Sequence, residues 1–162
     1  MDFHASLAKL TSHAIFREWH KKHQENFLAH GFMMLDDANK DVWQIGFYNP
    51  NNSKITTFIV GKTIEHTAEQ EVLESGAAIQ KLPVEEVKVE PQKALATAKE
   101  ILEKDFAREI PIKEFFIIQH IDKRTVFNIT YFTQSFKTVN IKLDAGSGEL
   151  ISKNIQALMD FG

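Results

Sequence analysis

The clearest hydrophobic pattern in the chain lies at residues 91–106, PQKALATAKEILEKDF. Its apolar side chains recur at helical spacing and form one stripe: Ala94, Leu95, Ala98, Ile101, Leu102 and Phe106. Pro91 suits the first turn of a helix, where its missing N–H costs no hydrogen bond. The pattern therefore predicts a helix with one buried face.

Three strands are predicted after this helix. Residues 114–122 form a strongly apolar run, and residues 125–132 and 138–144 alternate apolar with polar side chains. Such alternation is typical of a strand with one buried face. Joined by short turns, these segments predict an antiparallel meander whose apolar face carries the helix.

The turn DAGSGE, residues 144–149, closes this meander. Asp144 is expected to accept hydrogen bonds from backbone amides within the turn. Gly146 and Gly148 are expected to supply the positive φ values that a tight reversal needs. Glu149 then leads into the next segment.

The first half of the chain shows the same order of elements. A predicted helix over residues 12–30 precedes four predicted strands: residues 32–37, 42–48, 54–61 and 63–66. The two halves also share an alternating apolar face, with Trp43, Ile45 and Phe47 corresponding to Phe127, Ile129 and Tyr131. A slip of one residue would invert a strand, so this agreement favours a duplication. The sequence thus predicts an α+β fold of two repeats, each a helix packed on a small antiparallel β-meander.

Residues 75–91, rich in proline and glutamate, are the natural linker between the two repeats. We therefore predict domains at residues 1–80 and 81–162. Two segments next to these boundaries are ambiguous. Residues 67–74 fit either a helix or an extension of the preceding strand, and residues 152–161 favour a short terminal helix.

The composition excludes several classes of protein. Of the 162 residues, 43% are hydrophobic and 25% are charged, as in soluble globular proteins. The net charge of −3 comes without a basic face and argues against nucleic-acid binding. The absence of cysteine excludes disulfides and thiolate sites. The N-terminal segment predicts neither a signal peptide nor membrane insertion, so a cytoplasmic location is expected.

Residues 91–151 resemble the PepSY domain. The resemblance is carried by the alanine-rich helix and by the final motif Asp144, Ala145, Gly148, Glu149 and Leu150. Copies in that family typically end in Asp-Ala-x-Thr-Gly-Glu-Ile/Leu, and Ser147 stands here where threonine is usual. The resemblance implies a cystatin-like α+β unit, sometimes in tandem, that binds protein or peptide and in some members restrains peptidases. It implies no catalytic residues, because the family shares none.

Histidines and aromatic residues are the candidates for a site. His20 and His23, spaced i, i+3, are candidate ligands for zinc or nickel with His66 or Glu25 as the third, although solvated or core histidines are the more common outcome. Four aromatic residues are candidates for a ligand pocket, although core filling is again more common: Trp43, Phe47, Phe116 and Tyr131. His120 and Asp122 have the spacing of a base and its orienting carboxylate, although a surface pair at the end of a hairpin is the more common outcome.

No nucleotide-binding, serine-hydrolase or zincin motif occurs in the sequence, and no cofactor is predicted. The leading hypothesis is a non-catalytic binding or regulatory module that recognises a protein or peptide, with a homodimer as a further possibility. Sheet edges are one surface where such a partner would add. The alternative is a small-ligand- or metal-binding protein, including a hydrolase or isomerase that uses interior aromatics and histidines.

Overall fold

A single antiparallel sheet dominates the structure. The computed structural model describes residues 2–72 and 78–158. Within these residues the elements are α1 (Phe3–Thr11), α2 (Ala14–Lys21), β1 (Phe27–Met34), β2 (Trp43–Asn49), β3 (Lys54–Val60), β4 (Ile64–His66), β5 (Gln70–Glu71), the short 3-10 helix η1 (Val84–Glu86), α3 (Pro91–Asp105), β6 (Pro111–Ile121), β7 (Arg124–Thr133), β8 (Lys137–Asp144) and β9 (Leu150–Ala157).

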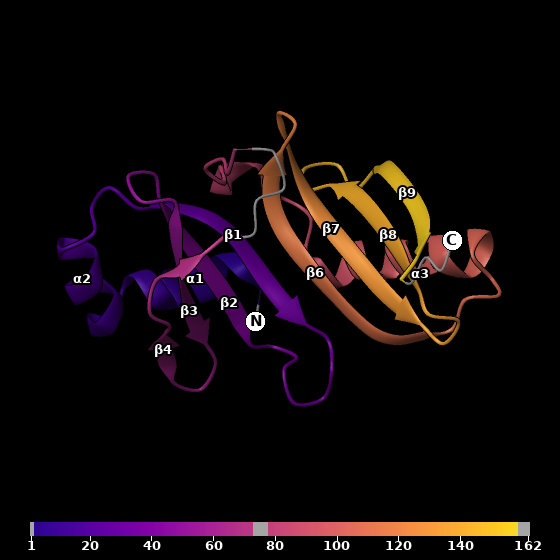
Figure 1. The fold of residues 1–162 in the computed structure, drawn as a ribbon, viewed down its shortest axis with the longest axis horizontal. Coiled ribbons are helices and arrows are strands. Elements are labelled where there is room, and N and C mark those ends of the chain that lie inside the picture. Colours follow the sequence, from indigo (N-terminus) through magenta and orange to yellow (C-terminus); the bar gives the residue numbers. More distant parts are fainter. Residues whose placement is uncertain (1, 73–77, 159–162) are drawn as a thin grey trace.

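The strands of both halves join in this one sheet. Their order is β4-β3-β2-β1-β6-β7-β8-β9, and β5 pairs with β3. The seam between the halves is the antiparallel pairing of β1 with β6, in which Gly31 lies opposite Ile118. Figure 1 shows α1 and α3 behind the sheet, on the same face. Within residues 2–72 and 78–158, the other face of the sheet carries no helix.

The prediction of two helix-on-meander repeats is wrong. The chain is a β-rich fold with one nine-stranded sheet across its described residues, and its helices are short. The predicted helix over residues 12–30 is confirmed only for α2, which ends at Lys21, and is wrong from Phe27 onward, where β1 begins. The apolar positions of residues 12–30 fit both the spacing of a helix and the alternation of a strand. The second part of this stretch alternates, so that Ala29, Gly31 and Met33 point into the core.

The second half follows its predicted elements more closely. Helix α3 and strands β6, β7 and β8 lie where the hydrophobic pattern predicts them. The short terminal helix is wrong, because residues 150–157 form β9 and pair with β8; residues 159–161 of that prediction lie outside the described residues. Of the ambiguous segment at residues 67–74, the described part includes β5, which is extended. The domain boundary near residue 80 stays a prediction.

The core lies between the sheet and its helices and is aromatic. The largest side chains that are fully buried include Trp43, Tyr131, Phe3, Phe58, Phe116 and Phe127. Trp43 contacts Phe3 of α1 and Phe116 of β6, with ring centroids 5.2 and 5.5 Å away. Residues from α1, β2 and β6 therefore share one core across the seam.

The segment between the two halves packs against the sheet. In its described part, residues 78–90, the side chains of Leu82 and Val87 are buried. The amide of Leu82 donates to the carbonyl of Leu28 in β1. This packing fixes the approach of the chain to α3 and places Glu86 and Lys88 beside the ends of β7 and β8.

Among the described residues, none of the helices has the length and apolar character needed to cross a membrane.

Candidate functional site

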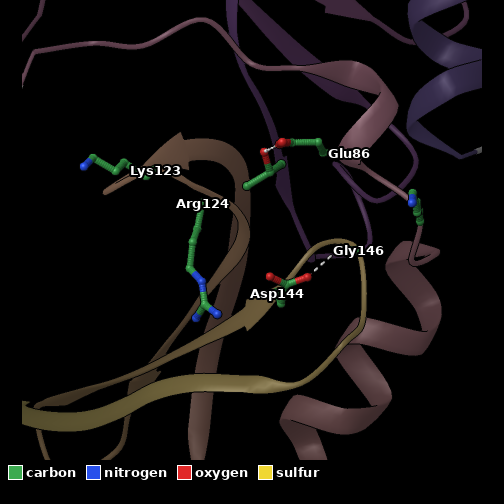
Figure 2. Close-up of a pocket in the computed structure, with 7 residues that line it drawn as sticks. Glu86, Lys123, Arg124, Asp144 and Gly146 are labelled. Carbon is green, nitrogen blue, oxygen red and sulfur yellow. Dashed lines mark hydrogen bonds between the residues drawn. The ribbon is translucent and has the colours of Figure 1, made fainter.

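The candidate site is a charged pocket where two turns of the sheet meet the segment before α3 (Figure 2). Its volume is about 330 Å³. Seven residues line it: Glu86, Lys88, Lys123, Arg124, Thr125, Asp144 and Gly146. The β6–β7 and β8–β9 turns lie at the same end of the meander, which brings these residues together.

The turn at residues 144–149 forms one wall of the pocket. The Asp144 carboxylate accepts hydrogen bonds from the amides of Gly146 and Ser147, at 2.8 and 2.9 Å. The amide of Gly148 donates to the Asp144 carbonyl, and the Asp144 amide donates to the carbonyl of Glu149. These bonds give a structural reason for an aspartate at the start of the turn motif. The side chain of Glu149 is exposed.

The two glycines of this turn have different roles. Gly148 has φ of +81°, as expected, but Gly146 does not have a positive φ, so that part of the prediction is wrong. A Cβ at Gly146 would lie 3.2 Å from the Asp144 carboxylate. Between them Ala145 is fully buried, and its carbonyl accepts from the amides of Lys88 and Val89. Ala145 thus attaches the turn to the segment before α3.

The β6–β7 hairpin carries the cations of the opposite wall. Asp122 and Lys123 form its two-residue turn and have φ of +48° and +66°. Positive φ at both central residues is the geometry of the type I′ turn, which matches the twist of a hairpin. Arg124 follows as the first residue of β7. In Figure 2, Arg124 and Asp144 project into the same space.

A buried threonine links the pocket to His120. Thr125 is only 4% exposed, and its hydroxyl donates to Glu86 Oε2 at 2.8 Å. His120 Nδ1 lies 2.9 Å from the same hydroxyl oxygen and 3.9 Å from Glu86 Oε2. Because the hydroxyl proton goes to Glu86, His120 must be the donor in its bond to Thr125. The Thr125 hydroxyl therefore bridges Glu86 and His120.

Within the described residues, the carboxylates of the pocket have hydrogen-bond partners, whereas its cations do not. It holds three cations and two carboxylates, a net charge of +1. Both carboxylates accept hydrogen bonds from their neighbours. In contrast, the described part of the chain offers no hydrogen bond or ion pair to the side-chain nitrogens of Lys88, Lys123 or Arg124. Such a pocket is able to bind an anionic group.

We expect Asp144→Ala to lower the free energy of unfolding by about 1–2 kcal/mol, because two amides lose a charged acceptor. The amides of Ser147 and then Gly146, helped by Arg124, lower the pKa of Asp144 despite a cost from desolvation. This stabilisation is therefore present above the ordinary pKa of 3.8 and is lost as the pH falls through the lower folded pKa. Urea unfolding at neutral and acidic pH measures both effects. Asp144→Asn keeps a carbonyl acceptor and should retain part of the stability. An equal loss of stability in both variants would show that the hydrogen bonds to the Asp144 side chain are not the cause.

The four candidate aromatics do not gather in one cavity. Trp43 and Phe116 lie at the base of a second pocket of about 330 Å³, between the start of α1 and the start of α3. Phe47 packs on the rings of Phe16 and Trp19. Tyr131 is buried in the core, where burial and then Glu114 raise the pKa of its hydroxyl.

The three candidate metal ligands are also dispersed. His20 stacks on Phe16, with ring centroids 5.3 Å apart. His23 stacks on Trp19, with ring centroids 4.8 Å apart, and its Nδ1 is hydrogen-bonded to the Trp19 carbonyl. His23 and His66 both line a shallow pocket. In residues 2–72 and 78–158, no three histidine, aspartate or glutamate side chains gather to hold a metal ion.

The cations of the pocket were not identified from sequence. Lys123 and Arg124 stand in the predicted turn at residues 122–124, and Asp144 in the turn that closes the same meander. In an up-and-down meander alternate turns lie at the same end, so their proximity could have been predicted. The contribution of Glu86 and Lys88 could not, because it depends on the packing of the segment before α3.

Comparisons with known proteins were made by sequence and by fold. No family model and no curated protein matches the chain. One solved structure of similar fold is a "putative lipoprotein" from Clostridium difficile 630. It is 12% identical, the TM-score is 0.54, and the match covers 88% of this chain and 90% of that one. At this identity the similarity shows the fold alone.

Proposed function

We propose that the protein is a non-catalytic binding module, and that the charged pocket seats a carboxylate of a protein or peptide partner. The observation that carries this proposal is the imbalance in the pocket. No side-chain hydrogen bond or ion pair holds the three cations among the described residues, although Arg124 interacts electrostatically with Asp144, whereas both carboxylates are already hydrogen-bonded. An acidic side chain would complete these cations with charge-assisted hydrogen bonds.

The mixed charge of the pocket favours a peptide carboxylate over a phosphate. A dianionic phosphate would meet the repulsion of Glu86 and Asp144 at close range. A single carboxylate experiences less of it. Glu86 and Asp144 also keep acceptor capacity for the N–H groups of an extended peptide.

The conformation of Lys123 supports this role. A left-handed backbone costs a residue with a Cβ about 1 kcal/mol or more, and glycine would avoid this cost. Lys123 lines the pocket, and in Figure 2 its side chain extends away from Asp144 and Glu86. We propose that a function of its charge offsets the less stable hairpin that lysine gives here in place of glycine.

A peptide titration tests the proposal. The probe is acetylated, amidated triglutamate, and the matched reference is triglutamine with the same end groups. Amide chemical shifts of ¹⁵N-labelled protein should change and saturate at residues 122–126 and 144–148 with triglutamate only. Added salt should weaken the binding, because the pocket is open to solvent.

Charge-reversal variants separate the pocket from general electrostatics. Arg124→Glu should weaken triglutamate binding at least about tenfold, since a charge-assisted hydrogen bond is replaced by repulsion. Lys62→Glu changes the net charge equally, at an exposed lysine in the β3–β4 turn, and should leave binding intact. Equal shifts with triglutamine, or equal losses in both variants, would overturn the proposal.

The second pocket favours one alternative, a small-molecule binder. Apolar side chains form most of its wall and charged groups its rim: Met33, Leu35, Trp43, Leu95 and Phe116, with Asp2, Lys40, Asp41 and Glu90. Apolar pockets of this size hold small ligands. Saturable shifts at Met33 and Leu95 with a fatty acid, but not with triglutamate, would favour this alternative.

Two further expectations stay proposals. One is the kinship of residues 91–151 with PepSY domains. The other is the cytoplasmic location expected from the sequence. The name of the structural neighbour does not support that location, because a lipoprotein is attached to a membrane by its lipid.

A further inference from the structure

The free edge of β9 is a surface that the proposed function does not use. Strand β9 ends the strand order and pairs with β8 (Figure 1). Along the part of the chain that the structure describes, its other side has no strand beside it. An unpaired edge presents a row of N–H and C=O groups that a second strand is able to bind.

The phase of the ladder identifies the groups that face outward. The amide of Leu158 donates to the carbonyl of Phe136, which makes these two residues a hydrogen-bonded pair. Hydrogen-bonded and non-hydrogen-bonded pairs alternate along an antiparallel ladder. The N–H and C=O groups of Lys153, Ile155 and Ala157 therefore point away from β8.

This edge lacks the usual protection against strand pairing. Natural edges are guarded by proline, by free charges or by bulges. Strand β9, LISKNIQA, contains no proline, and its one charged residue is Lys153. The Lys153 ammonium is held 2.6 Å from Asp105 of α3 and so turns away from the edge. The bulge of this pair lies near the start of β9, and residues 152–157 are in regular register.

Exposed apolar side chains gather at the same end of the sheet. Five of the large exposed hydrophobics of the described chain lie there: Ile110, Ile112, Phe136, Ile155 and Leu158. Backbone hydrogen bonds hold the segments together, from Gln134 to Ile110 and from Leu158 to Phe136. Several exposed apolar side chains at one end of a sheet are a feature of surfaces that bind a partner.

We propose that β9 pairs antiparallel with β9 of a second copy of this chain, with Ile155 at the two-fold axis. In this register Ile155 faces its own copy, and Lys153 faces Ala157 of the other chain. The apolar side chain meets an apolar side chain, and the single cation meets no like charge. A register centred on Lys153 would oppose two cations, which is unfavourable. The edge is thus self-complementary, as an isologous dimer requires.

Sedimentation or light scattering of the full chain tests this pairing. The wild type should have twice the mass of one chain. Ile155→Lys should be a monomer with an unchanged far-UV CD spectrum, because two lysines would then face each other. Ile15→Lys is the matched control: Ile15 is 38% exposed, against 39% for Ile155, and lies on α2. This control should remain a dimer.

A cysteine scan tests the register, and the chain has no native cysteine to interfere. Opposed residues of a hydrogen-bonded pair have Cα atoms about 5.5 Å apart, which suits a disulfide. Ile155→Cys should therefore form a disulfide-linked dimer under mild oxidation. The two copies of Ser152→Cys would lie about 20 Å apart and should not. A monomeric wild type, or equal cross-linking at both positions, would overturn the proposal and leave the edge to an extended segment of a different protein.

Discussion

Trp43→Ala is expected to lower the free energy of unfolding by about 3–5 kcal/mol and to leave unfolding a single transition. Trp43 is fully buried between Phe3 of α1 and Phe116 of β6. Its removal leaves a cavity in the part of the core that both halves share. Since a domain of this size has about 5–15 kcal/mol in all, the loss is a large fraction of its stability.

Urea unfolding followed by two probes measures this effect. Trp19 is the one tryptophan left in the variant and reports on the first half by fluorescence, whereas far-UV CD reports on the whole sheet. The two curves should coincide, as expected for one cooperative unit. Ile15→Ala, at an exposed position on α2, should cost less than about 0.5 kcal/mol. Two separate transitions would show that each half has its own core.

The stability of the protein is expected to fall by about 3 kcal/mol as the pH drops from 6.5 to 4, because of His30. Burial lowers the pKa of His30 from 6.5 to about 4. Its ring lies on the helix-free face of the sheet, over Gly46, where an added Cβ would come within 2.4 Å of it. Its neighbours on the adjacent strands are Gly46 and Gln119, neither of which carries a charge.

The direction follows from proton linkage. The folded pKa is the lower one, so the unfolded chain takes up the proton first as the pH falls. His30 therefore leaves the free energy of unfolding unchanged above pH 6.5. The loss of stability that its protonation causes is complete below about pH 4. Urea midpoints across this range measure the slope. His30→Gln should flatten it, whereas His20→Gln, at an exposed histidine on α2, should not. An unchanged slope in His30→Gln would assign the pH dependence to other groups.

Local patterns predicted the elements of this protein better than their assembly. Helix α3 and strands β6 to β8 have one clear period each, and their boundaries follow from it. In contrast, residues 12–30 fit both a helical period and a strand period, and tertiary packing decides between them. One such contact is at Gly31, where an added Cβ would come within 2.5 Å of the Phe3 ring. The wrong terminal helix has a related cause, since β9 is extended through its pairing with β8.

The candidate site shows the same division. The hydrogen bonds of Asp144 were predictable because they lie within six residues of one turn. The buried contact of Ala145 with Lys88 and Val89 was not, because it joins segments more than fifty residues apart. For the histidines and aromatic residues, the sites suggested by sequence do not form. Their residue types suggested sites, but helix stacking and core packing disperse them.

The seam between β1 and β6 has a consequence for synthesis on the ribosome. Gly31 and its partner Ile118 are 87 residues apart in the chain. At about 5–20 residues per second, β1 waits roughly 4–17 seconds for the strand that will cover its second side. During that interval the nascent N-terminal half exposes an edge that becomes the middle of the finished sheet, and it needs protection from neighbouring chains until translation has passed β6.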